Sequence, residues 1–268
     1  MKLARKSLYL HSIINYSSKI MANIFTYSIG KKFIQSVSGA FLIIFLTIHT
    51  VINSFSLIDT FKGTFGTVAV DNDLFSKGDG LYKLGCDFMS TPFISIIVPV
   101  LAFGLLIHFI YGAILTFQNI KARGGYKRYA VKSKAAVDSW SAKNMFALGV
   151  VIVGFLCFHL CHFWAKMQLP EMFGIGTYED NPYCLLIATF GKWWVTLLYI
   201  VWLVALWFHL MHGFWSMFQT VGWSGDTWYK RLKCIGSIVV SLLVLVLILV
   251  AVNSFLHANG VLPNNFLQ

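Results

Sequence analysis

The segment Val201–Phe218, VWLVALWFHLMHGFWSMF, decides the fold class of this chain. Its side chains are apolar over most of its length, which is typical of the middle and end of a membrane-spanning helix. Two ionisable side chains, His209 and His212, interrupt it. An ionisable side chain within a membrane is costly and usually has a function. Ala205 and Gly213 lie four residues either side of His209, on the same helix face, and leave a flat slot against the backbone.

The composition of the whole chain agrees with a membrane protein. Of its 268 residues, 57% are hydrophobic and 12% are charged, whereas soluble domains carry about 25% charged residues. The net charge of +11 does not indicate nucleic-acid binding, because the charges lie in the N-terminus and the predicted loops, as a membrane topology requires. The five cysteines form no CxxC pair, so neither a disulfide framework nor a zinc site is predicted.

Five segments are long enough to cross a bilayer, which takes about 20 apolar residues. The predicted helices cover about residues 33–57, 92–117, 144–164, 183–219 and 234–256. We therefore expect an all-α integral membrane bundle over residues 33–258, with a basic segment at 1–32 and a short tail at 259–268. No secretory signal is predicted. MANIFTYSIGKK from Met21 looks like a natural start, with residues 1–20 as an extension.

Lysine and arginine set the predicted orientation, because they favour cytoplasmic loops. The loops on one side contain nine basic side chains: Lys121, Arg123, Lys127, Arg128, Lys132, Lys134, Lys230, Arg231 and Lys233. The loops on the other side are mainly acidic: Asp59, Asp71, Asp73, Asp79, Asp87, Glu171, Glu179 and Asp180. We expect a cytoplasmic N-terminus and an outer C-terminus. No aspartate or glutamate is predicted within a span.

Six of the eight histidines fall within predicted spans, at two depths. On the two helices that run outward, His49 lies 17 residues after Lys32 and His159 lies 16 residues after Lys143. On the two helices that run inward, His108 lies 16 residues after Pro92 and His209 lies 17 residues after Lys192. The two levels are about 6–10 residues apart, or about 9–15 Å. Two histidines from different helices at each level suit two bis-imidazole haems, because haem iron takes axial ligands from opposite faces. The alternative is a set of core histidines that only hydrogen bond locally.

Small neighbours distinguish the inner level. His108 has Gly104 and Gly112 four residues on either side, as His209 has its alanine and glycine. The same positions around His212 are phenylalanine and serine, which favours His209 over His212 as a ligand. The outer histidines have mainly phenylalanines at these positions.

Four motifs carry a family resemblance: SVSGAFLIIFLTIHTVIN, LLIHFIYGAILTFQ, FLCFHLCHFW and FHLMHGFWSMFQTVGW. Over about residues 29–256 the chain resembles the dihaem cytochrome b membrane anchor of succinate:quinone oxidoreductases, of the five-helix, single-subunit type. In that family a glycine follows the helix 4 ligand by four positions and another lies near the helix end. Gly213 and Gly222 match these positions. The resemblance thus implies His209 rather than His212 as a ligand.

The resemblance implies further features of the site. It pairs His49 with His159 and His108 with His209, which are the same pairs that the depths of the residues predict. It leaves His162 outside the ligand set. Gln35 and Ser36 match family positions near the propionates of the inner haem. The resemblance implies two haem b groups as cofactors and a quinone, menaquinone in this family, as substrate.

The implied function is electron transfer between quinone and an iron–sulfur subunit in a bacterial cytoplasmic membrane. A separate flavoprotein subunit contains the succinate site, so this chain has none. His162 is the leading candidate for the quinone site, because quinone chemistry needs proton donors. Some relatives have a glutamate two residues before the helix 4 ligand, where this chain has Trp207. No buried carboxylate pathway across the membrane is therefore predicted.

Three other classes compete with this interpretation. The nearest is the dihaem anchor of another quinone-linked dehydrogenase, such as a hydrogenase or formate dehydrogenase. A membrane di-iron oxygenase is less well supported, because HxxxH and HxxHH boxes are missing. A transporter usually shows broken helices and intramembrane acidic residues, and neither is predicted from this sequence.

Overall fold

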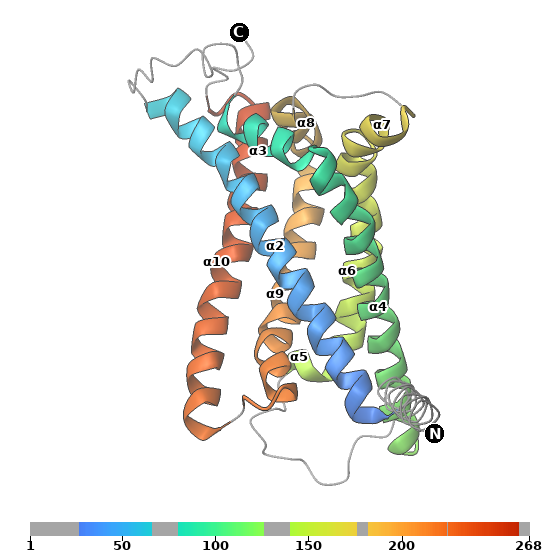
Figure 1. Cartoon of the computed structure of the whole chain (residues 1–268). Helices are drawn as coiled ribbons and strands as arrows, with labels where there is room; N and C mark the ends of the chain where they lie inside the picture. Colours follow the sequence, from blue (N-terminus) through green and yellow to red (C-terminus); the bar gives the residue numbers. More distant parts are fainter. Residues whose placement is uncertain (1–26, 66–79, 126–139, 176–181, 224, 263–268) are drawn as a thin grey trace, which may run out of the picture.

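The computed structural model describes residues 27–65, 80–125, 140–175, 182–223 and 225–262, and these form helices without any strand. Figure 1 shows them as an elongated bundle. The elements are α2 (Ser28–Phe65), α3 (Leu81–Met89), α4 (Pro92–Ala122), α5 (Trp140–Lys143), α6 (Met145–His159), the π-helical turn η1 (Leu160–Trp164), α7 (Gln168–Phe173), α8 (Pro182–Phe190), α9 (Trp193–Thr220) and α10 (Asp226–Ala258).

Five stretches are long and apolar enough to cross a membrane: Ser28–Thr60, Ile96–Ala122, Met145–Trp164, Trp193–Thr220 and Thr227–Ala258. Large apolar side chains cover their outer surface. Ile44 of α2 is 61% exposed and Phe103 of α4 is 64% exposed, which suits contact with lipid rather than water. The predicted all-α, multi-pass membrane fold is confirmed at this level.

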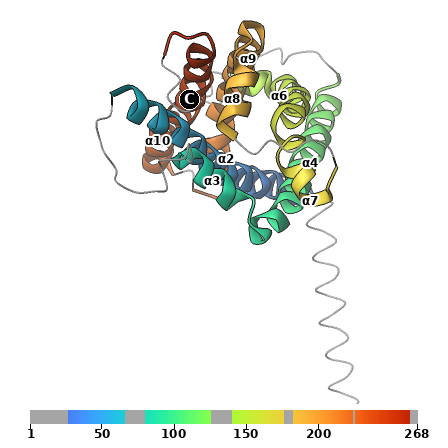
Figure 2. The ribbon, with the colours of Figure 1, turned by 90° about the horizontal axis from the view of Figure 1, so that it is seen from above.

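Four of the helices form a ring. Around it α2 packs on α4, α4 on α6, α6 on α9, and α9 on α2, while α10 packs outside the ring on α9 and α2. Figure 2, seen along the bundle, shows α10 on one side of α2 and α4 with α6 on the other. In this ring α2 lies diagonally across from α6, and α4 lies diagonally across from α9. Side chains that reach across a diagonal meet inside the bundle.

The first and last described helices end on opposite sides of the bundle. α2 begins at the end where α4 and α9 finish, and α10 finishes at the other end, beside α3 and α8 (Figure 1). We call these the inner and outer ends, after the predicted orientation, which stays a prediction. Many of the charged residues from which the orientation was predicted lie outside the described residues: the basic side chains from 127 to 134, Asp71, Asp73, Asp79, Glu179 and Asp180. So do residues 1–26 of the basic segment and 263–268 of the tail.

The first span is longer than predicted, and this corrects one expectation. α2 continues to Phe65, so Asp59 lies within it, and its candidate span Ser28–Thr60 contains an acidic residue. Asp59 is 3% exposed. Its carboxylate accepts hydrogen bonds from the backbone N–H groups of Leu81 (2.9 Å) and Tyr82 (2.8 Å) at the start of α3. A carboxylate at a helix N-terminus satisfies unpaired N–H groups and the helix dipole, which explains how the helix keeps this charge.

The fourth predicted helix is broken, which corrects a second expectation. It divides into α8 and α9 at Gly191 and Lys192, and Lys192 has an extended backbone with ψ 113°. A methyl group on Gly191 would lie 3.0 Å from Ala258 of α10, so glycine allows this close approach. The hydroxyl of Thr196 donates to the carbonyl of Phe190 at 2.6 Å and replaces a backbone bond lost at the break.

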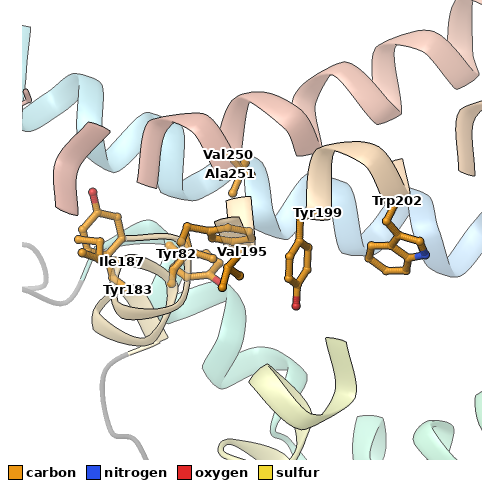
Figure 3. Packing of buried hydrophobic residues seen from close by; sticks show 10 residues of the cluster. Tyr82, Tyr183, Ile187, Val195, Tyr199, Trp202, Val250 and Ala251 are labelled. Carbon is orange, nitrogen blue, oxygen red and sulfur yellow. The ribbon is translucent and has the colours of Figure 1, made fainter. Parts of the chain in front are cut away.

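The tightest core lies at the outer end, between α3, α8, α9 and α10. Its members are large and often aromatic: Tyr82, Tyr183, Leu186, Ile187, Phe190, Val195, Tyr199, Trp202, Val250 and Ala251. Figure 3 shows Tyr199 and Trp202 at one edge of this cluster, on α9. Burial raises the pKa of Tyr82 and Tyr183, and raises the pKa of the Cys86 thiol to about 12. We therefore assign these groups, which stay protonated, to packing.

Candidate functional site

The inner histidine pair spans the α4–α9 diagonal. The rings of His108 and His209 face each other with 6.3 Å between their centres and 70° between their planes. Gly149 of α6 borders the pair, because a methyl group there would lie 3.8 Å from Cε1 of His209. The structure thus brings together the two histidines that depth analysis places at one level.

The outer histidine pair spans the α2–α6 diagonal. The rings of His49 and His159 are 5.9 Å apart at 85°. Aromatic rings surround them. Phe45 stacks on His49 at 5.6 Å, and Trp202 and Tyr199 lie 5.7 and 6.0 Å from His159.

The two pairs lie at separate levels of the bundle. His159 contacts Tyr199 and Trp202 on α9, whereas the inner pair uses His209 of the same helix. His209 follows these two residues by ten and seven positions, which corresponds to about 10–15 Å along a helix. This agrees with the separation predicted from the sequence.

The ring separations of both pairs are close to that of two imidazoles bound to one metal ion. Imidazole nitrogens bind metals at about 2 Å, so two coaxial rings on one ion have centres about 6 Å apart. The angle between ring planes is free to rotate about that axis. The Nδ1 atoms of His159 and His209 are buried and have no hydrogen-bond partner among the described residues. The described residues contain no group of three or more His, Cys, Asp or Glu suited to a metal ion. A macrocycle that supplies the equatorial ligands itself, as haem does, fits a two-histidine site.

The glycines on either side of His108 allow side chains of α2 to approach α4 closely. A methyl group on Gly104 would lie 3.0 Å from the Phe41 ring, and one on Gly112 would lie 3.3 Å from Nε2 of Gln35. The expected flat slot is therefore filled by side chains of α2, which approaches α4 closely here. A haem placed against this face requires these two side chains to move. Beside His209, a methyl group on Gly213 would lie 3.6 Å from Met145.

Of the two residues expected near the inner haem, the structure brings one to the pair. The amide nitrogen of Gln35 lies 3.2 Å from Nε2 of His108. Ser36 is half-buried, and its hydroxyl makes no hydrogen bond to another described residue. Ser38, which the sequence did not single out, lies 3.1 Å from Nδ1 of His108 through its hydroxyl. Its spacing of three residues from Gln35 was the available signal, because such residues share a helix face.

The two remaining histidines of the spans stay outside the pairs. The ring of His212 lies against Trp215 at 5.1 Å. His162 lies within η1, and its Nδ1 is 3.1 Å from the hydroxyl of Tyr199. A π-helical turn inserts an extra residue and is often found at functional sites. The sequence missed Tyr199, whose only signal was a hydroxyl within an apolar span.

The structure has two half-buried imidazole pairs across the helix bundle, with a histidine–tyrosine hydrogen bond beside the outer pair. Comparisons with family models, with curated proteins and with solved structures found no match for this chain.

Proposed function

We propose that this chain is the membrane anchor and electron-transfer subunit of a succinate:quinone oxidoreductase. In this proposal, His108 with His209 and His49 with His159 are the axial ligands of two haem b groups. The observation that carries it is the pair of cross-diagonal histidine contacts at 6.3 and 5.9 Å, at two levels of one bundle. When bound, the haems accept and donate single electrons. The histidines hold the iron from two helices, and the apolar walls exclude water from it.

The outer level supports a quinone site. Quinone reduction takes up two protons along with two electrons, so the site needs groups that exchange protons. His162 and Tyr199 provide two such groups joined by one hydrogen bond of 3.1 Å. Tyr199 also contacts the ring of His159, so the two proton-exchanging side chains lie beside the outer histidine pair. We assign quinone binding to the surroundings of His162 and Tyr199, with menaquinone as the expected quinone.

The inner end suits the soluble partners. Exposed basic side chains at this end include Lys121, Arg123, Lys230, Arg231 and Lys233. An iron–sulfur subunit docked at this end would transfer electrons to the inner haem first. The succinate site belongs to the flavoprotein subunit beyond it. A bacterial cytoplasmic membrane is the proposed location.

The first test is optical. The purified chain in detergent is reduced with dithionite, and the difference spectrum is recorded together with a pyridine haemochrome count. We expect about two low-spin b-type haems per polypeptide, because four histidines form two pairs. A chain that contains no haem after expression with an adequate haem supply would contradict the proposal.

The dihaem anchor of another quinone-linked dehydrogenase is supported by the same two histidine pairs. Affinity purification from the native membrane separates the two assignments. A flavoprotein with succinate dehydrogenase activity in the eluate supports our proposal, and a hydrogenase or formate dehydrogenase supports the alternative. A di-iron oxygenase requires clustered histidines and carboxylates, and the described residues contain no such group.

A further inference from the structure

Lys233 is a charged side chain within the last candidate membrane span. It lies in α10, inside the span Thr227–Ala258, at the inner end of the bundle where α9 finishes and α10 begins (Figure 1). Its side chain is exposed and forms no ion pair with a described residue. A charge within a span is costly unless it finds a partner or reaches the membrane surface. The surroundings of Lys233 therefore show what this charge is for.

Two aromatic rings from neighbouring helices hold the ammonium group of Lys233. Its Nζ lies 6.0 Å from the ring centre of Trp215 on α9 and 6.0 Å from that of Tyr229 on α10. The two rings meet edge to face, with 5.5 Å between their centres and 89° between their planes. A cation at this distance is attracted to an aromatic ring. Lys233 is therefore placed at the junction of α9 and α10.

Tyr229 adds an unused hydrogen-bonding group to the same cluster. Its hydroxyl oxygen is buried and has no hydrogen-bond partner among the described residues. Buried hydroxyl groups normally have a partner, because burial without one costs free energy. Lys233 follows Tyr229 by four residues, so the two side chains share one face of α10. The cluster thus offers an ammonium group and a hydroxyl group to an acceptor from outside the chain.

A second cation and an apolar strip adjoin this cluster. Lys230 lies three residues before Lys233 and is exposed. Cys234 and Ile238 follow Lys230 by four and eight residues and are also exposed, so they continue the same side of the helix toward the middle of the span. An anion bound at the two lysines is therefore next to an apolar surface.

We propose that the inner end of the α9–α10 junction binds an anionic phospholipid, whose phosphate pairs with Lys233 and Lys230 and accepts a hydrogen bond from the hydroxyl of Tyr229. Its acyl chains lie along the exposed strip that continues through Ile238. Basic sites between membrane helices on the cytoplasmic side bind anionic lipid headgroups. Inside a span, a lipid phosphate reaches these cations more readily than an acidic soluble partner does. The inference goes beyond the proposed function and does not depend on haem.

The test follows thermal unfolding of the purified, delipidated full chain in detergent. Phosphatidylglycerol, phosphatidylcholine or inorganic phosphate is added, because a ligand that binds the folded chain raises its unfolding temperature. We expect a saturable rise with phosphatidylglycerol and almost none with the other two. Native mass spectrometry should detect a phosphatidylglycerol molecule retained on the chain.

Single substitutions test the two donors. Lys233→Gln should raise the phosphatidylglycerol concentration for half of the temperature shift about fivefold, the usual contribution of one basic side chain near an anionic lipid. Tyr229→Phe should raise it about tenfold, because a hydrogen bond to a charged group is lost. Lys121→Gln is the matched control, since Lys121 is an exposed lysine in the last turn of α4 at the same end of the bundle. It should leave the concentration unchanged.

Tyr229→Phe has a second readout that distinguishes lipid binding from packing. Without lipid, the substitution removes a buried hydroxyl that has no partner, so the unfolding temperature should not fall. With saturating phosphatidylglycerol, the variant should unfold below the temperature of the wild-type chain. A fall of equal size in both conditions would assign the hydroxyl to the fold and contradict its role at the lipid.

Three further outcomes would overturn the proposal. Equal temperature shifts with phosphatidylglycerol and phosphatidylcholine would mean that the headgroup charge is not recognised. An equal shift with inorganic phosphate would mean that the cluster binds a free anion and not a lipid. A wild-type response in both Lys233→Gln and Tyr229→Phe would place the bound lipid elsewhere on the chain.

Discussion

The inner and outer histidine pairs have nearly the same ring separation but different surroundings. The inner pair contacts polar side chains of α2, with Ser38 and Gln35 on the two nitrogens of His108. The outer pair is surrounded by aromatic rings, including Phe45 and Trp202. Hydrogen bonds therefore restrain His108 in the inner pair, whereas aromatic rings pack around both histidines of the outer pair.

Removal of single histidines should have the largest effect and should test the pairing itself. His108→Ala and His209→Ala are each expected to lose the inner haem, and His49→Ala and His159→Ala the outer one, because one axial ligand does not hold a low-spin haem. A double change within a pair should lose no more than a single change, whereas one change in each pair should lose both haems. Pyridine haemochrome counts and redox titration measure this.

The control variants for the histidine changes are His162→Ala and His212→Ala, which should retain two haems. Loss of haem in His212→Ala, with retention in His209→Ala, would mean that the ligand in α9 is the other histidine.

Overpacking at Gly39 should affect the inner haem but not the outer one, and its effect should be smaller than that of removing a histidine. Gly39→Val places new atoms against the ring of His108, and overpacking a tight contact costs about 1–3 kcal/mol. We expect a lower thermal unfolding temperature and loss of the inner haem with the outer haem intact. Gly154→Val is the matched control in α6, because nothing lies within 4 Å of a methyl group there. Equal haem loss in both variants would contradict a local effect on His108.

The smallest effect on stability is expected from Tyr199→Phe, which removes one hydroxyl at the outer level. The lost bond to His162 should cost about 0.5–1.5 kcal/mol, and both haems should remain. Quinone turnover by the complex should nevertheless fall, because a proton-exchanging group is missing. Tyr111→Phe is the control, since Tyr111 lies in α4 three residues after His108 and its hydroxyl forms no hydrogen bond to a described residue. Unchanged turnover in Tyr199→Phe would remove this hydroxyl from the proposed quinone site.

The sequence was sufficient for the spans and for the two histidine levels. Hydropathy reports which segments suit lipid, and counting residues along a helix reports depth, because each residue rises by a constant 1.5 Å. Both quantities vary along one dimension, so His49 and His159, or His108 and His209, could be matched without knowledge of neighbouring helices. Element ends were less accurate, as for α2, whose last turns contain the buried Asp59.

The tertiary structure alone decided what lies beside each histidine. The sequence did not show the partners of Ser38 and Tyr199, because each partner lies on another helix, 70 residues away for Ser38 and 37 residues away for Tyr199. The glycine at position 191, beside the helix break, also allows close approach to a remote residue, Ala258 of α10. Composition and periodicity determine that a helix enters the membrane and how deep its side chains lie. Rotation and close approach between helices depend on packing, because those energies arise between segments far apart in the chain.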